Sequence, residues 1–174
     1  MKLLFALLLI SSLAQANSIP IELHSENDVA KVVLSARAQV FVLVPQLHSK
    51  IVANALRRIA VEGHVRVLIL CDASLITDRS SFIPTLSYLQ QRQHPIEVRL
   101  LERITQTSLI VDDARAVFGP LVMESWTYGL KPTRLILDTA KSLEQSQHFW
   151  LQWKRAKPWT FETSNPTFTT GGKP

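Results

Sequence analysis

The sequence has very little cysteine and lacks several short motifs that mark common enzyme chemistries. Cys71 is the only cysteine, so no disulfide can form within the chain. It ends the apolar stretch Val65–Cys71, which favours a buried thiol over one that pairs with another chain. No glycine-rich phosphate loop and no G-x-S-x-G motif is present, so P-loop nucleotide hydrolysis and serine-hydrolase chemistry are unsupported. The 5 histidines have no acidic or cysteine partners at ligand spacing, and we expect no metal and no cofactor.

Long apolar runs are also scarce, and the longest lies at the N-terminus. Lys2 precedes the apolar run Leu3–Ile10, and small and polar residues follow it as far as Ala16. The run is too short to span a bilayer, so this layout predicts a signal peptide at residues 1–16 that is cleaved after Ala16. A buried N-terminal helix is the alternative. We therefore expect a periplasmic or secreted protein whose mature chain has no transmembrane segment.

The remaining pattern predicts one α/β domain at residues 17–157. Apolar strands are separated by amphipathic helices, which implies a mixed sheet with a parallel part and helices on both faces. The expected strands are 19–23, 39–44, 65–71, 96–101, 108–111, 115–118 and 133–138. The expected helices are 25–36, 49–63, 80–91 and 139–156. The polar tail 158–174 is rich in Thr, Gly and Pro and is expected to be disordered.

Two of these helices have apolar patterns that predict which side chains are buried. In the second helix, Ile51, Val52, Ala55, Leu56 and Ile59 are expected on one buried face. In the last helix, Trp150 and Trp153 are expected to pack against the sheet on the same face as Leu143. An aromatic and basic surface that stacks bases or meets a membrane is the alternative for this helix.

A hairpin at residues 105–122, TQTSLIVDDARAVFGPLV, leads to a family resemblance. The order of elements and this hairpin resemble the single-motif, exported endonuclease type of the phospholipase D superfamily. The resemblance covers nearly all of the mature chain, including residues 29–44, 55–70, 87–101 and 149–156. The family signature is H-x-K, four residues, Asp, six residues, Gly-Ser, one residue, Asn. Aligned on the hairpin, Asp112 and Gly119 match this signature.

The other positions of the signature do not match. Thr105 stands in place of the histidine, Thr107 in place of the lysine, Pro120 in place of the serine and Val122 in place of the asparagine. In such enzymes the histidine attacks phosphorus and the lysine stabilises charge on the phosphoryl oxygens. A threonine hydroxyl without an adjacent base is a poor nucleophile, and a second hydroxyl does not replace an ammonium group. The resemblance therefore implies the fold without the family's own catalysis, a pseudoenzyme.

Other residues could still form a phosphate-binding pocket without cleavage. His48 and Lys50 flank Ser49 at the predicted start of the second helix, where backbone N–H groups attract anions. Arg103 could point into the same pocket as Thr105 and Thr107. The alternatives are a solvated loop around His48, and surface ion pairs of Arg103 with Glu102, Asp112 or Asp113. Asp112 is expected to hold the hairpin turn, and Asp72 to cap a turn or helix.

Three functions remain open. The first is a binding protein for nucleic acid or another phosphate-containing ligand; the formal net charge of +5 permits contact with a polyanion but does not require it. The second is a scaffold for another exported protein, and the resemblance implies a homodimer. The third is an active phosphodiesterase, nuclease or phospholipase that uses non-standard residues such as His48.

Overall fold

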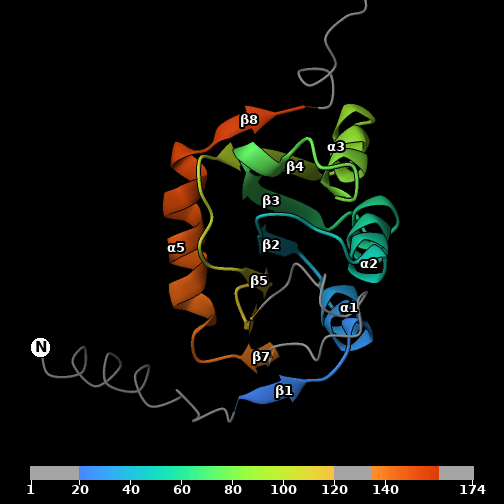
Figure 1. The fold of residues 1–174 in the computed structure, drawn as a ribbon. Helices are drawn as coiled ribbons and strands as arrows, with labels where there is room; N and C mark the ends of the chain where they lie inside the picture. The colour runs from blue at the N-terminus through green and yellow to red at the C-terminus, as the bar shows by residue number, and fades with distance from the viewer. Residues whose placement is uncertain (1–19, 120–134, 161–174) are drawn as a thin grey trace, which may run out of the picture.

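The computed structural model describes residues 20–119 and 135–160, which form an open mixed sheet between two layers of helices (Figure 1). The sheet has eight strands in the order β1-β7-β6-β5-β2-β3-β4-β8. The strands are β1 Ile21–Leu23, β2 Gln39–Leu43, β3 Arg66–Asp72, β4 Ile96–Leu101, β5 Ser108–Val111, β6 Arg115–Phe118, β7 Leu135–Asp138 and β8 Lys157–Trp159. The helices are α1 Glu26–Leu34, α2 Lys50–Val61, α3 Ile83–Gln91 and α5 Ser142–Arg155, with a short 3₁₀ turn at Ala73–Leu75.

The centre of the sheet is parallel and its flanks are antiparallel, so the predicted mixed sheet with a parallel part is confirmed. β3 pairs in parallel with both β2 and β4, whereas β5, β6, β7, β1 and β8 join by antiparallel pairing. Figure 1 shows α1, α2 and α3 along one face of the sheet and α5 alone across the other. No helix in the described part of the chain is long and apolar enough to cross a membrane.

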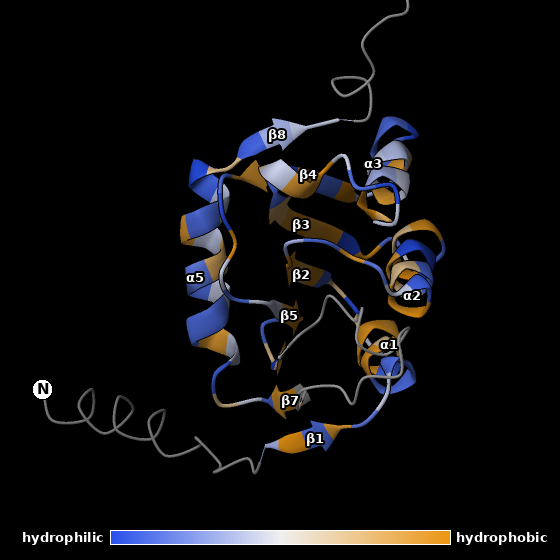
Figure 2. Ribbon diagram, viewed as in Figure 1, coloured by the Kyte–Doolittle hydropathy of each residue, from blue (hydrophilic) through white to orange (hydrophobic). Residues whose placement is uncertain are grey.

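Successive side chains of each central strand pack alternately into two separate hydrophobic cores, one on each face of the sheet. On β2, Val40 and Val42 belong to the core beneath α1, α2 and α3, and Phe41 and Leu43 belong to the core beneath α5. Strands that are buried on both faces read as nearly continuous apolar runs because neither side meets water. Figure 2 shows this hydrophobic colouring along β2 and β3.

The aromatic residues of α5 anchor this helix across the sheet. Phe149 stacks on Phe41 with ring centroids 4.7 Å apart, and Trp153 stacks on Phe149 at 5.5 Å. The guanidinium of Arg99 lies 4.4 Å from the Trp153 ring centroid. Packing of these rings against the sheet is therefore confirmed. The burial of Leu143 is not, because Leu143 is 62% exposed beside the buried row that faces the strands.

Several details differ from the sequence prediction. α3 begins at Ile83 instead of residue 80, because Ser80 and Ser81 donate to Asp78 and form a turn that ends before the helix. Ile51 is 41% exposed, so the apolar arc of α2 is wider than its buried face. β8 was not expected at all.

The position of β8 also corrects the expected domain boundary. This strand pairs with β4, and its Trp159 is only 5% exposed, so the fold continues past residue 157. The predicted signal peptide and most of the predicted tail lie outside the described residues.

Candidate functional site

The carboxyl ends of β2, β3 and β4 meet at one edge of the sheet, where open α/β sheets commonly bind ligands. Leu43, at the end of β2, pairs with Ser108 at the start of β5. The segment 102–107 therefore connects the end of β4 to the start of β5 along this edge. This placement brings Arg103, Thr105 and Thr107 to the edge where a ligand would bind.

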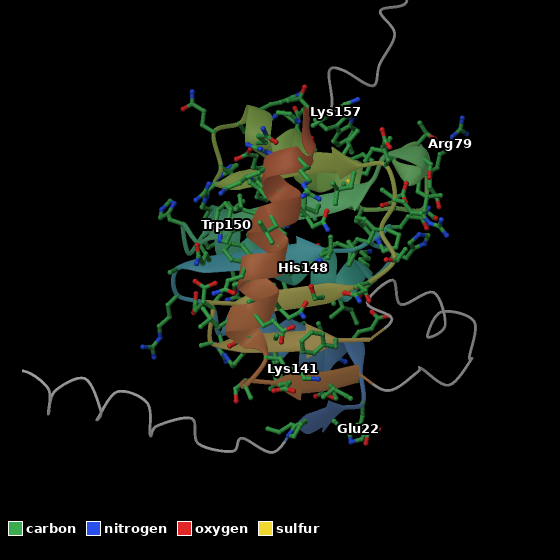
Figure 3. The ribbon with its side chains drawn as sticks, turned by 90° about the vertical axis from the view of Figure 1, so that its left-hand side faces the viewer. Glu22, Arg79, Lys141, His148, Trp150 and Lys157 are labelled. Atoms are coloured by element: carbon green, nitrogen blue, oxygen red, sulfur yellow. The ribbon has the colours of Figure 1, made fainter. Side chains whose placement is uncertain are left out.

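One flank of α5 borders the same edge. Its polar side chains recur at intervals of three and four residues, which is the spacing of one helical face. They are Gln145, His148, Gln152 and Arg155, preceded by Lys141 at the N-cap of the helix, and they line three adjoining hollows. Figure 3 shows His148 on the side of α5 toward Arg79, and Trp150 on the opposite side. The polar side of α5 therefore borders the edge where a ligand would bind, and its aromatic side faces the opposite edge.

The middle hollow, which we call the central pocket, has a volume of about 180 Å³. Its polar lining residues are Arg103, Thr105, Gln106, His148 and Gln152, and its apolar ones are Leu43, Leu101 and Ile104. None of these described lining residues is a carboxylate. Guanidinium, hydroxyl and amide groups all offer hydrogen-bond donors, so the lining suits an anion.

Two larger hollows continue the central pocket along α5. One, of about 380 Å³, shares Gln106 and adds Thr107 and Lys141, with Glu144 as an acidic neighbour. The other, of about 620 Å³, shares Arg103 and adds Arg155 and Lys157, with Glu102 as its carboxylate. Together the three hollows form what we call the α5 groove. Its described cations outnumber its carboxylates, with His148 counted as neutral.

Buried Asp72 supports the segment that forms the pocket. Its Oδ1 accepts hydrogen bonds from the Ser74 N–H at 2.9 Å and the Ser74 hydroxyl at 2.6 Å, which confirms the predicted cap. Its Oδ2 accepts from the Ile104 N–H at 3.2 Å, between the two pocket residues Arg103 and Thr105. Burial opposes ionisation of this carboxyl, but these hydrogen bonds and the nearby Arg103 charge lower its pKa overall.

The predicted phosphate-binding residues separate into two groups. Arg103 and Thr105 lie together in the central pocket, and Thr107 lies in the adjoining hollow, where its hydroxyl donates to the Gly119 carbonyl. His48 and Lys50 line neither the central pocket nor the two hollows beside it. They belong instead to the turn that enters α2, on the other face of the sheet.

His48 is held in a closed ring of polar side chains. Its Nε2 lies 2.9 Å from Gln46 Oε1, and its Nδ1 lies 3.1 Å from Ser80 Oγ. Asp78 closes the ring by accepting from the Gln46 amide at 2.7 Å and from the Ser80 hydroxyl at 2.7 Å. Only 10% of the His48 side chain is exposed. These contacts join the β2–α2 turn to the loop before α3, and His48 is not among the residues that line the central pocket.

Asp112 lies at the other end of the sheet from the pocket. Its carboxylate accepts from the backbone N–H groups of Arg37, Ala38 and Gln39, each at 2.9 Å. Asp112 lies in the hairpin turn, but its carboxylate ties this turn to the segment that enters β2, whereas the sequence had suggested bonds to nearby turn N–H groups. Asp112 and Asp113 both have positive φ, 53° and 54°, which a type I′ turn requires.

Of the remaining positions of the family signature, only Gly119 lies within the described residues. Gly119 has a φ of 117°, a conformation that favours glycine. Pro120 and Val122 lie outside the described residues. Within residues 20–119 and 135–160, no group of three His, Cys, Asp or Glu side chains is arranged to hold a metal ion.

Comparison with known proteins identifies this architecture. No model of a known family and no curated protein matches the sequence. Among solved structures, NucT from Helicobacter pylori aligns with a TM-score of 0.64 and 18% identity, over 81% of this chain and 98% of that one. Nuc from Salmonella typhimurium, a phospholipase D family member, aligns with a TM-score of 0.64 and 15% identity, over 82% and 99%. The chain has the phospholipase D fold. This result confirms the predicted fold class.

A third structure shares this phospholipase D fold over part of its length. TrmBL2, an archaeal chromatin protein described as binding DNA, aligns with a TM-score of 0.61 and 11% identity, over 89% of this chain and 60% of that one. Structural similarity at such low sequence identity establishes the fold only. What the site can do chemically has to be argued from the residues of this chain. In the phospholipase D fold of this chain, those residues are the lining of the α5 groove.

The sequence analysis missed His148 and Gln152, the contribution of α5 to the central pocket. His148 was considered only as one of several scattered histidines. The signal that could have found both residues is the polar row at positions 141, 145, 148, 152 and 155, which begins at the N-cap of α5 and follows one side of the helix. It lies directly beside the buried row that contains Ser142, Ser146, Phe149 and Trp153. A polar row next to a buried row marks the flank of a helix at the border of its contact surface.

Proposed function

We propose that this chain is an exported protein with the phospholipase D fold that binds a phosphate-bearing ligand without cleaving it. The observation that carries the proposal is the central pocket, which combines Arg103 with Thr105, His148 and two amide side chains and has no carboxylate in its described lining. Arginine recognises phosphate oxygens through two parallel N–H donors. Export follows from the signal-peptide layout of residues 1–16, and the compartment is the periplasm or the medium.

The absence of turnover follows from the groups at the motif positions. Thr105 and Thr107 replace a nucleophilic histidine and a lysine, and the Thr107 hydroxyl already donates to the Gly119 carbonyl. Loss of such groups commonly lowers the rate by several orders of magnitude. The only imidazole in the described lining of the central pocket is His148, so a residual phosphodiesterase would depend on His148 more than on His48.

The α5 groove favours an extended polyanion over an isolated phosphate. Lys141, Arg103, Arg155 and Lys157 place positive charge along its length, on both sides of the central pocket. Successive phosphates of a nucleic acid would meet successive cations, and each neutralised phosphate releases counterions. A single lipid headgroup would engage the central pocket alone.

The test is binding of the mature chain, residues 17–174, to fluorescein-labelled single-stranded DNA across a salt series, with the same samples checked for cleavage. We expect affinity that falls steeply with salt and no cleavage. Arg103→Gln should weaken binding and reduce the salt slope by about one contact. Arg37→Gln is the matched control, because exposed Arg37 lies at the opposite end of the sheet.

Three outcomes would change this conclusion. Equal effects of Arg103→Gln and Arg37→Gln would show general charge attraction and remove the central pocket from the proposal. Binding to phosphatidic acid vesicles with no binding to DNA would replace the polyanion by a lipid headgroup. Cleavage that survives repurification and disappears in His148→Ala would show an enzyme.

A scaffold that forms a homodimer is the second candidate, and the outer face of α5 favours it. Leu143 and Leu151 are 62% and 59% exposed on this one helix, and exposed apolar side chains that form a patch mark interaction surfaces. Light scattering of the mature chain tests this candidate. A dimer that Leu151→Glu converts to monomer, with unchanged DNA binding, would support it, and a monomeric wild-type chain would exclude it.

A further inference from the structure

A second groove lies on the opposite face of the molecule, between α1 and α2. It has a volume of about 650 Å³ and is separate from the α5 groove. Its lining includes the buried residues Ala30 and Ala55, which form what we call the floor of the groove. Leu34 of α1 and Ile51 of α2 border this floor and are 43% and 41% exposed. Figure 2 shows hydrophobic colouring on both helices where they adjoin.

The rim of this α1–α2 groove is positively charged. Its described lining includes Lys31, Arg57 and Arg58 and contains no carboxylate. Asp28 pairs with Lys31 at 3.2 Å, and Glu62 pairs with Arg58 at 3.0 Å, both outside the lining. The two basic side chains are 77% and 63% exposed, and such exposed pairs contribute little and exchange partners easily. Arg57 makes no ion pair with a described carboxylate.

Shape and charge together select one kind of occupant. α1 and α2 have 9 and 12 residues, so the groove can hold about three turns of a third helix at 1.5 Å per residue. A small-residue floor permits close approach of a helix backbone, and the exposed leucine and isoleucine supply apolar contacts. A second copy of this chain would bring one cationic rim against another, which opposes self-association through this groove.

We propose that the α1–α2 groove docks an amphipathic helix of another protein whose apolar face is flanked by aspartate or glutamate. The helix lies along the alanine floor between Leu34 and Ile51, and its carboxylates pair with Lys31, Arg57 and Arg58. This site uses no residue of the central pocket, so it stands or falls independently of phosphate binding.

The experiment measures fluorescence anisotropy of a designed, fluorescein-labelled helical peptide mixed with the mature chain. The peptide has about four turns, alanine and leucine on one face and glutamate on both flanks. Two control peptides are used. A scrambled peptide of the same composition tests the amphipathic pattern, and a peptide with lysine in place of glutamate tests the charge. We expect both to bind at least about tenfold more weakly than the designed peptide.

Variants locate the binding to the groove. Arg57→Glu and Ile51→Gln should each weaken binding of the designed peptide by at least about tenfold, while Lys154→Glu on α5 should leave it unchanged. Because these positions are exposed, we expect the variants to fold, and circular dichroism checks that they do. Equal binding of the scrambled peptide, or insensitivity to Arg57→Glu, would overturn the proposal. Binding to phosphatidylglycerol vesicles without binding to the peptide would also overturn it, as would a wild-type dimer that Ile51→Gln dissociates.

Discussion

Replacing Asp112 by asparagine tests how much this carboxylate contributes to the stability of the fold. Asp112 Oδ2 accepts from the Arg37 N–H, and Oδ1 accepts from the Ala38 and Gln39 N–H groups. Asparagine has one acceptor oxygen, so its NH₂ group would face at least one of these donors. One hydrogen bond to a charged group is lost, at about 1.5–3 kcal/mol, and the others fall to neutral strength. We expect Asp112→Asn to lower the free energy of unfolding by about 3 kcal/mol near pH 7.

The effect should depend on pH in a defined direction. Burial opposes ionisation of Asp112, but the hydrogen bonds from Gln39, Ala38 and Arg37 and the charge of Arg115 lower its pKa below the ordinary 3.8. A carboxyl with a lowered pKa in the folded state contributes stability above its unfolded pKa. That contribution is lost as the pH falls through the folded pKa. The difference between wild type and Asp112→Asn should therefore be complete near neutral pH and shrink below about pH 4.

Urea and thermal denaturation of the mature chain, followed by circular dichroism, measure this effect. At about 2–4 °C per kcal/mol for a domain of this size, the midpoint should fall by about 6–12 °C near pH 7. Asp113→Asn is the matched control, because Asp113 also has positive φ but its carboxylate accepts one described hydrogen bond, from the Gln39 amide to Oδ2 at 2.7 Å, which an asparagine oxygen can still accept. We expect this control to change stability by less than about 1 kcal/mol. Equal effects of the two substitutions, or an Asp112→Asn effect that persists unchanged in acid, would refute the reasoning.

Three further predictions concern the two cores and a helix cap. Burial raises the pKa of the Cys71 thiol to about 12. The native protein should therefore resist a thiol reagent near pH 8 that labels the urea-unfolded chain. Rapid labelling of the native protein would contradict the burial of this thiol. Phe149→Ala removes the ring stacked on Phe41 and should lower the free energy of unfolding in urea by about 3–5 kcal/mol, against less than about 0.5 kcal/mol for the exposed control Leu143→Ala. Ser49→Ala removes a buried hydroxyl that accepts from the Val52 N–H at 3.1 Å and donates to Glu26 Oε2 at 2.6 Å. A thermal melt should show a loss of about 1–2 kcal/mol, and an unchanged melt would contradict a stabilising role of this cap.

Most elements could be predicted from the sequence because they depend on local patterns. Ser25 and Ser49 stand at the starts of the predicted helix ranges 25–36 and 49–63, and both side chains cap their helices by accepting a backbone N–H. The apolar runs that became β2 and β3 are buried on both faces, as their composition indicated. Side-chain periodicity records whether a segment is buried on one side or two, and this property needs no knowledge of distant partners.

Features that depend on a distant partner were harder to predict. β8 has only three residues and exists because β4 presents an open edge, which no pattern within residues 157–159 reveals. Ile51 and Leu143 fit the apolar periodicity of their helices, but each lies at the flank of a contact surface whose width is set by the neighbouring element. His48 was grouped with Arg103 because both follow strands at one edge of the sheet. The structure shows that they leave that edge on opposite faces.

The sequence by itself determined the α/β architecture and its resemblance to the phospholipase D fold, and this resemblance places Thr105 and Thr107 at the histidine and lysine positions of the family signature. These features follow from the sequence because the order of strands, the periodicity of helices and the identity of residues are properties of local segments. Only the tertiary structure decided which donors share a pocket. His148 is more than 40 positions from Arg103 in the sequence, and it reaches the same pocket because α5 crosses the sheet with its aromatic rings packed on Phe41. That crossing is fixed by side-chain packing between distant segments, and no local pattern specifies it.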